Sequence, residues 1–301
     1  RHELTGSNGN KVPLQPDEYV VDDQEEDEYN EKLKLLTPAH KSLDPNVKEA
    51  QAGAGELLWL STKTRVDIVY PVSRCCSLAT TEPLRAIRII KGIMRYLAAT
   101  REMGLVYWSF KRLTSTVKEF MQSYPSTQPL TDAFFDNTVV SYSDASFAPN
   151  WDYSVGAFVV TFAGCPVSWR CSKQALQSLS ACESELQASQ EGYTGSLNVR
   201  TLLGELTHRQ YDTVLAIDNQ ATVQLLNSVG AMSWRTRHLK IRADVLVQAR
   251  IQGEVRVIHV PGEVQLADLL TKALPANRQA MLRLLSGLKR KQVLFDYSDL
   301  H

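Results

Sequence analysis

The order of hydrophobic patterns between residues 139 and 264 constrains the fold of this 301-residue chain more than any other feature. Segments 139–144, 154–163 and 165–171 have strand-like patterns, and the turn Ala163-Gly164-Cys165-Pro166 joins the last two as a hairpin. The patterns that follow indicate a helix at about 181–206, an apolar strand at 213–218, a short helix at about 220–228, a longer helix at about 235–252, a strand at 254–260 and a last helix from about 264. This order predicts an α/β domain with a mixed five-stranded sheet flanked by helices.

Composition and charge predict the organisation of the remaining chain. Residues 1–31 hold ten acidic and two basic residues without an apolar period, so we expect a disordered acidic tail. Residues 32–110 are predicted to be a small helical segment, in which Thr81 caps a helix that begins at Pro83 and runs to about Thr100. We expect a linker at 111–135, the α/β domain at 136–285 and a C-terminal tail at 286–301.

The overall composition excludes several classes of protein. A chain with 44% hydrophobic and 22% charged residues is typical of a globular protein, and no apolar run is long enough to span a membrane. The chain begins with Arg1 and has no signal core in its first thirty residues, so we expect a piece of a longer intracellular protein. Its five cysteines lack metal-binding spacing and are expected to be free thiols.

Four acidic residues lie at the ends of predicted elements. Asp144 and Asp218 end strands, whereas Glu185 and Asp268 lie in the first turns of helices. Any one of them could be an ordinary strand-end or helix-start residue. All four in this order favour a shared site at the carboxyl ends of the strands, where converging carboxylates require hard divalent cations. Two Mg²⁺ ions about 4 Å apart, or Mn²⁺ as a substitute, could activate a water and stabilise the leaving oxygen of a phosphodiester.

The segments around these acids resemble the four signature segments of ribonuclease H in the order D…E…D…D. They are Ser143-Asp144-Ala145-Ser146, Glu185-Leu186-Gln187-Ala188, Ile217-Asp218-Asn219-Gln220 and Ala267-Asp268. More narrowly, residues 50–285 resemble the end of the Pol polyprotein of copia-type LTR retrotransposons. The further matching stretches include Gly55-Glu56-Leu57-Leu58-Trp59-Leu60, Thr64-Arg65-Val66-Asp67-Ile68, Arg235-Thr236-Arg237-His238 and Ala267-Asp268-Leu269-Leu270-Thr271-Lys272.

This resemblance implies a division of labour along the chain. Residues 32–110 would be the thumb or connection of a reverse transcriptase, and 136–285 its ribonuclease H-like domain. The domain would hydrolyse the RNA strand of RNA–DNA hybrids during reverse transcription, with Asp144, Glu185, Asp218 and Asp268 as catalytic and metal-binding residues. The polymerase aspartates would lie upstream, so this fragment is expected to have no polymerase activity. Its partners would be the hybrid and the upstream palm and fingers, in a cytoplasmic retrotransposon particle or the nucleus.

The chain also departs from the family pattern. Val66 stands where the family usually has Pro, Asp244 stands where many members have His, and Glu263 lies near the place of a loop His that cellular ribonucleases H use. The last change affects proton transfer or product release rather than metal binding. Glu183 competes with Glu185 for the second carboxylate position, and Glu185 is preferred because its segment copies the family spacing.

Two groups of polar residues are candidates for reading the substrate. Ser146, Asn219 and Gln220 lie beside the acids, where the 2′-hydroxyls of a hybrid must be recognised. Basic residues at a helix start favour phosphate contacts over a merely solvated face, whereas a basic stripe along an earlier helix is equally consistent with phosphate contact and with a solvated face. They are Arg235, Arg237, His238, Lys240 and Arg242 in the first set, and Arg85, Arg88, Lys91 and Arg95 in the second.

Two function classes therefore remain. The first is a metal-dependent endonuclease that cuts the RNA strand of hybrids. The second is a catalytically silent nucleic-acid-binding or assembly module from a decayed or domesticated element. Retention of all four acids favours the first class. An integrase or transposase of the same fold would end its acidic series with Glu, whereas this series ends with Asp268.

Overall fold

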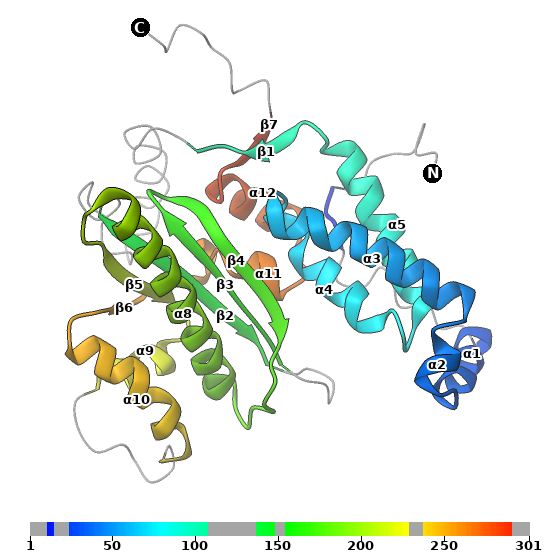
Figure 1. Cartoon of the computed structure of the whole chain (residues 1–301), viewed down its shortest axis with the longest axis horizontal. Helices are drawn as coiled ribbons and strands as arrows, with labels where there is room; N and C mark the ends of the chain where they lie inside the picture. The colour runs from blue at the N-terminus through cyan, green and yellow to red at the C-terminus, as the bar shows by residue number, and fades with distance from the viewer. Residues whose placement is uncertain (1–10, 15–23, 108–136, 148–153, 229–236, 291–301) are drawn as a thin grey trace, which may run out of the picture. The chain divides into compact units, whose positions relative to one another are not determined.

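The computed structural model describes residues 11–14, 24–107, 137–147, 154–228 and 237–290, and the side chains of 237–242 and 290 are not part of the description. The chain folds as two compact units (Figure 1). Unit 1 comprises Arg1–Leu105, Lys272–Arg283 and Leu288–His301, and unit 2 comprises Val106–Thr271 and Leu284–Gly287. Among the described residues, no helix combines the length and the apolar character needed to cross a membrane.

Unit 2 contains the predicted mixed sheet. Its strands are β2 (Thr138–Ser146), β3 (Val155–Phe162), β4 (Cys165–Lys173), β5 (Asp212–Ile217) and β6 (Arg256–His259), in the order β4-β3-β2-β5-β6. The first three strands are antiparallel, and β5 runs parallel to both β2 and β6. The predicted fold class, a five-stranded α/β sheet with flanking helices, is confirmed. The hairpin turn consists of Ala163 and Gly164, both with positive φ, which suits a tight turn between twisted strands.

The alternation of side chains along β5 explains why its last four residues, 214–217, are all apolar. Leu215 and Ile217 pack on one face of the sheet against α8 (Ala181–Thr207), α9 (Gln220–Asn227) and α10 (Arg237–Ile251). Val214 and Ala216 pack on the opposite face with Val260 and Val264. A stretch of strand that is buried on both faces favours apolar side chains at successive positions. Asp218 follows directly after the end of β5.

Two glycines allow α8 to lie close to the sheet. A Cβ atom on Gly192 would lie 2.8 Å from Ser141 Oγ, and one on Gly195 would lie 2.7 Å from the ring of Phe158. Glycine normally weakens a helix interior by about 1 kcal/mol. Here it permits α8 to pack closely against β2 and β3 (Figure 1). This packing determines how far from the sheet Glu185 lies, two turns earlier on the same helix.

The prediction of a single last helix from about residue 264 is wrong. The chain instead forms a 3₁₀ turn at Gly262–Val264, the short α11 (Asp268–Thr271) and then α12 (Ala276–Leu285). Pro275 explains the interruption, because proline disfavours helical geometry in the residue before it. Residues 272–283 belong to unit 1, which differs from the predicted domain end at 285.

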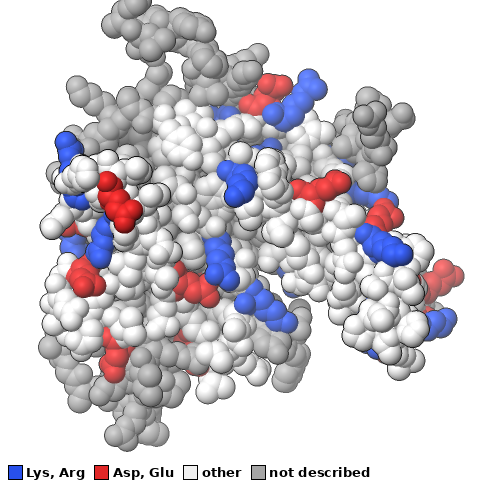
Figure 2. All heavy atoms as spheres, viewed as in Figure 1, with Lys and Arg blue, Asp and Glu red and all other residues white. Residues whose placement is uncertain are grey.

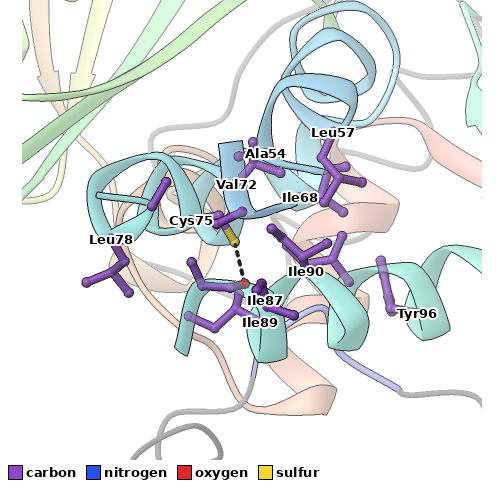
Figure 3. Close-up of a cluster of buried hydrophobic side chains, with 14 residues drawn as sticks. Ala54, Leu57, Ile68, Val72, Cys75, Leu78, Ile87, Ile89, Ile90 and Tyr96 are labelled. Atoms are coloured by element: carbon purple, nitrogen blue, oxygen red, sulfur yellow. Dashed lines mark hydrogen bonds between the residues drawn. The ribbon is translucent and has the colours of Figure 1, made fainter. Parts of the chain in front are cut away.

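Unit 1 is a helical unit closed by a small strand pair. Its elements are α1 (Gln24–Lys34), α2 (Pro38–Lys41), α3 (Pro45–Lys63), a 3₁₀ turn at Val66–Ile68, α4 (Val69–Leu78), α5 (Pro83–Ala99), α12, and β1 (Met103–Leu105) paired antiparallel with β7 (Leu288–Arg290). The core lies between α3, α4 and α5, where Leu57, Val72 and Ile90 are buried together (Figure 3). Cys75 lies in this core, where its Sγ donates to the carbonyl of Ala86 and burial raises the pKa of its thiol.

Three sequence expectations in unit 1 are wrong. Residues 24–31 are helical rather than disordered, because Leu33 is buried, Tyr29 donates to Asp44 and Glu26 pairs with Arg88. The cap residue of α5 is Glu82 rather than Thr81, and no side-chain cap bond forms there. Residues 103–105 and 288–290, expected as helix and tail, form the strand pair β1 and β7.

A buried polar network holds the segment around Val66. Arg65 forms an ion pair with Asp67 at 2.8 Å, and the Tyr96 hydroxyl donates to the same carboxylate at 2.5 Å. Arg283 donates to the Tyr96 oxygen, and Gln279 donates to the carbonyl of Asp67. These contacts explain why most of α12 belongs to unit 1. Removing one partner would leave a buried charge unsatisfied, which is costly.

Candidate metal centre

Asp144, Glu185 and Asp218 come together in unit 2, with one carboxylate oxygen from each lying within 4.8 Å of the others. The register of the parallel pair explains two of them. Ser143 lies opposite Ile217, where the parallel pairing of β2 and β5 ends, so Asp144 and Asp218 follow at the same end of the two strands. The predicted convergence of the acids at the carboxyl ends of the strands is therefore seen for these two residues. The expectation that Asp144 ends its strand is wrong, because β2 continues to Ser146 in its pairing with β3, whereas Asp218 does follow the end of β5.

Glu185 reaches the same edge from the first turns of α8. Ser180 caps this helix, with its side chain accepting from the backbone N–H of Glu183. The Glu185 Oε1 atom accepts a hydrogen bond from the backbone N–H of Ala145 at 3.2 Å, and only 5% of the residue is exposed. This bond ties the carboxylate of the helix to the strand residue that follows Asp144.

Glu183, the competing candidate, has a different environment. Its carboxylate accepts from the backbone N–H of Leu179 at 2.8 Å, in the loop that precedes α8. A carboxylate in the first turn of a helix also interacts favourably with the helix dipole. Glu183 therefore stabilises the N-terminus of α8, whereas Glu185 lies in the acidic group.

Asp268 lies outside the group of three, although it is only 2% exposed and begins α11. The helix nevertheless reaches the group. Thr271, one turn after Asp268, donates a hydrogen bond from its hydroxyl to Asp144 Oδ2. Residues three apart lie on the same face of a helix, so Asp268 and Thr271 share the face that contacts β2. The fourth acid is thus brought to this end of the sheet but not into the cluster.

The backbone around Asp218 is held by β6. His259 Nε2 lies 3.1 Å from the carbonyl oxygen of Asp218, and Val260 donates to the carbonyl of Ile217 at 2.9 Å. The His259 ring is exposed, and its contact is with the backbone of Asp218 rather than with the carboxylate.

The residues predicted to read the substrate lie in different settings. Ser146 ends β2, and Gln220 is exposed at the first position of α9. Asn219 caps α9, its Oδ1 accepting from Thr222 N at 3.0 Å. Arg235 lies outside the described residues. Arg237, His238, Lys240 and Arg242 lie in the first turns of α10, and their side chains are outside the description.

The predicted basic stripe on α5 is divided. Arg85 pairs with Glu82 at 2.9 Å, and Arg88 binds both carboxylate oxygens of Glu26. Lys91 and Arg95 are exposed. On the face drawn in Figure 2, basic and acidic side chains of the described residues are interspersed. Half of the stripe is therefore engaged within unit 1, and the exposed half retains the predicted opportunity for phosphate contact.

The donor set of the acidic group fits a hard divalent cation. Carboxylate oxygens are the ligands that Mg²⁺ takes in proteins, and Asp144 and Glu185 are almost completely buried. Three carboxylates this close together repel one another, and a bound cation relieves the repulsion.

No protein-family model matches the chain. Curated relatives do. The chain is 23% identical over 239 residues to a retrovirus-related Pol polyprotein from transposon TNT 1-94 of Nicotiana tabacum, which covers 79% of this chain and 16% of that protein. It is 28% identical over 243 residues to the Pol polyprotein from transposon RE1 of Arabidopsis thaliana, and 23% identical over 276 residues to the transposon Ty1-NL2 Gag-Pol polyprotein of Saccharomyces cerevisiae. These matches cover 80% and 90% of this chain, and 14% of each relative.

Solved structures that resemble the chain include ribonucleases H. The N-terminal RNase H domain of rv2228c from Mycobacterium tuberculosis is 12% identical with a TM-score of 0.35, and the match covers 50% of this chain and 98% of that one. LC11-RNase H1, solved in complex with an RNA/DNA hybrid, is 13% identical with a TM-score of 0.33, covering 42% of this chain and 88% of that one. The curated relatives confirm the predicted resemblance to retrotransposon Pol polyproteins.

Proposed function

We propose that unit 2 is the ribonuclease H domain of a copia-type element. The similarity of the chain to retrotransposon Pol polyproteins and the mixed five-stranded sheet of unit 2 support this proposal. The reaction of unit 2 would be the metal-dependent endonucleolytic hydrolysis of the RNA strand of RNA–DNA hybrids during reverse transcription. The chain spans only 14–16% of the length of the relatives described above, so the upstream palm and fingers of the same polyprotein are proposed as its partners.

The observation that carries this proposal is the convergence of Asp144, Glu185 and Asp218 from two strands and a helix. Buried carboxylates are expensive to keep charged unless they bind cations or are well hydrogen-bonded. A module that only binds nucleic acid would gain nothing from three negative charges facing a polyanion, because they repel phosphate. The acidic group therefore supports the nuclease over the silent binding module.

The three acids of the group would hold the cation, with Asp268 supporting them from α11. When bound, two Mg²⁺ ions would supply Lewis-acid stabilisation of charge on the scissile phosphate. The chain's own carboxylates orient the site, because Glu185 is fixed to β2 through Ala145 N and Asp144 is fixed to α11 through Thr271. Gln220, which is exposed two residues after Asp218, would read a 2′-hydroxyl in the minor groove.

A cleavage assay tests the proposed function directly. The purified chain, incubated with a hybrid labelled on its RNA strand, should cut that strand internally when Mg²⁺ or Mn²⁺ is present and should stop when EDTA is added. Labelled duplex DNA of the same sequence serves as the control and should stay intact. Binding of the hybrid without any cleavage in either metal would contradict the nuclease and favour the silent module.

The exposed part of the α5 stripe gives a prediction about hybrid binding. Replacing both Lys91 and Arg95 with Ala should reduce the salt dependence of hybrid binding by about two units on a log–log plot, or somewhat less, because two phosphate contacts no longer release counterions. The weakening should be similar for any sequence. The variant Arg85→Ala is the comparison, since that residue already pairs with Glu82. A salt slope equal to the parent's in the double variant would mean that the stripe is only a solvated face.

A further inference from the structure

The segment between β6 and the end of α11 carries a second feature besides Asp268. Three hydrogen bonds connect the Gln265 side chain to elements that carry acids, and Thr271 adds a fourth connection. Both residues are almost completely buried, at 0% and 1% exposure. Polar side chains are kept in such places only when their hydrogen bonds are made, so their contacts indicate what they hold.

Gln265 holds the strand ends and α11 together. Its Nε2 atom donates to the carbonyl of Ser143 at 3.0 Å and to that of Ala216 at 3.4 Å, and its Oε1 accepts from Ala267 N at 3.3 Å. Ser143 immediately precedes Asp144, and Ala216 lies two residues before Asp218. One amide therefore links β2, β5 and the start of α11 at the level of the acids.

Thr271 contacts an acid itself. Its hydroxyl donates to Asp144 Oδ2 and also lies 3.4 Å from the carbonyl of Ala267 within α11. Because that hydroxyl binds one named oxygen of Asp144, it limits the rotation of the carboxylate about its terminal bond. The Asp144 carboxylate is thereby given a defined orientation before any cation binds.

We propose that Thr271 is a positioning residue for the metal centre: its hydroxyl orients the Asp144 carboxylate, and Gln265 keeps α11 where the hydroxyl can reach it. The inference rests on the proposed metal-dependent function. It deepens that function, because it assigns the residue that presets one ligand. The hydrogen-bond partners of metal ligands fix ligand orientation, and their loss typically lowers metal affinity or activity about 10–100-fold.

The test measures Mn²⁺ binding by the full chain without nucleic acid, from the loss of the electron paramagnetic resonance signal of free Mn²⁺. Thr271→Val keeps the side-chain shape and removes the hydroxyl, so the Kd should rise about 10-fold or more. Thr271→Ser keeps the hydroxyl and should bind Mn²⁺ nearly as the parent does. Thr161→Val is the matched control: Thr161 is equally buried, but its hydroxyl donates to the carbonyl of Val140, and the Kd should not change.

The outcomes separate the two proposals. An unchanged Kd in folded Thr271→Val, or the same loss in Thr271→Ser as in Thr271→Val, would overturn the positioning role and leave the nuclease intact. A parent chain that binds no Mn²⁺ would overturn the metal-dependent function, and this inference with it. A structural effect alone would lower the thermal stability of Thr271→Val in EDTA without changing its Kd at a temperature where it is folded.

A measurement on the parent covers the case in which Thr271→Val does not fold. A hydroxyl proton that is donated to a buried carboxylate exchanges slowly enough to be seen by proton NMR. The Thr271 hydroxyl resonance should be visible and should shift when Mg²⁺ is added, since the cation withdraws charge from the oxygen that accepts it. A resonance that Mg²⁺ leaves in place would overturn the proposal.

Discussion

Asp218→Asn is expected to bind an RNA–DNA hybrid at least as well as the parent chain while cutting it at least about 10²–10³-fold more slowly. Asparagine keeps the shape of the side chain and removes one negative charge from the group formed with Asp144 and Glu185. The cation loses a charged ligand, and with it the stabilisation of charge in the transition state. Binding survives because one fewer carboxylate repels the phosphates.

Asp212→Asn is the matched control for this variant. Asp212 begins the same strand, β5, and is exposed at the end away from the acidic group. The two variants make the same chemical change on one strand, so they separate loss of the metal centre from a general effect on charge. Single-turnover cleavage should be near the parent rate for Asp212→Asn. Cleavage by Asp218→Asn within a few-fold of the parent would rule out the metal centre proposed here.

Much of unit 2 could be predicted because its pattern is consistent at every level. The apolar run of β5 requires burial on both faces, and parallel pairing with β2 then brings Asp144 and Asp218 to one edge. The position of α8 depended on information that a pattern does not carry. Because Gly192 and Gly195 lack a Cβ atom, α8 can approach the sheet closely at these positions, and this approach determines where Glu185 lies.

The parts that could not be predicted depend on contacts between distant residues. By its charge alone, the acidic segment before residue 32 resembles a disordered tail. In the structure, Glu26 forms an ion pair with Arg88, and this contact holds α1 in unit 1. Likewise, Asp67, Tyr96 and Arg283 are far apart in the sequence, and their network draws most of α12 away from the predicted domain. Thr271 belongs to a motif that the sequence had already singled out, but its role depends on which oxygen its hydroxyl reaches.

Glu185→Gln and Glu183→Gln make the second prediction, because these two residues are identical in type, two positions apart and equally buried at 5% exposure. Glu185→Gln should slow cleavage about 10²–10³-fold, since the amide lacks the charge that the cation requires. It should leave the fold intact, because the amide oxygen can still accept from Ala145 N.

Glu183→Gln should cut at close to the parent rate. Its amide oxygen can still accept from Leu179 N, so the loop before α8 is retained, and only the favourable interaction of the charge with the helix dipole is lost. That interaction is typically about 0.3–1 kcal/mol, which should appear as a small decrease in the denaturant midpoint. The two variants should therefore differ in which quantity changes: Glu185→Gln lowers the cleavage rate, and Glu183→Gln slightly lowers the stability. The reverse result would transfer the second carboxylate position to Glu183 and would mean that the acidic group seen around Asp144 is not the one that binds the metal.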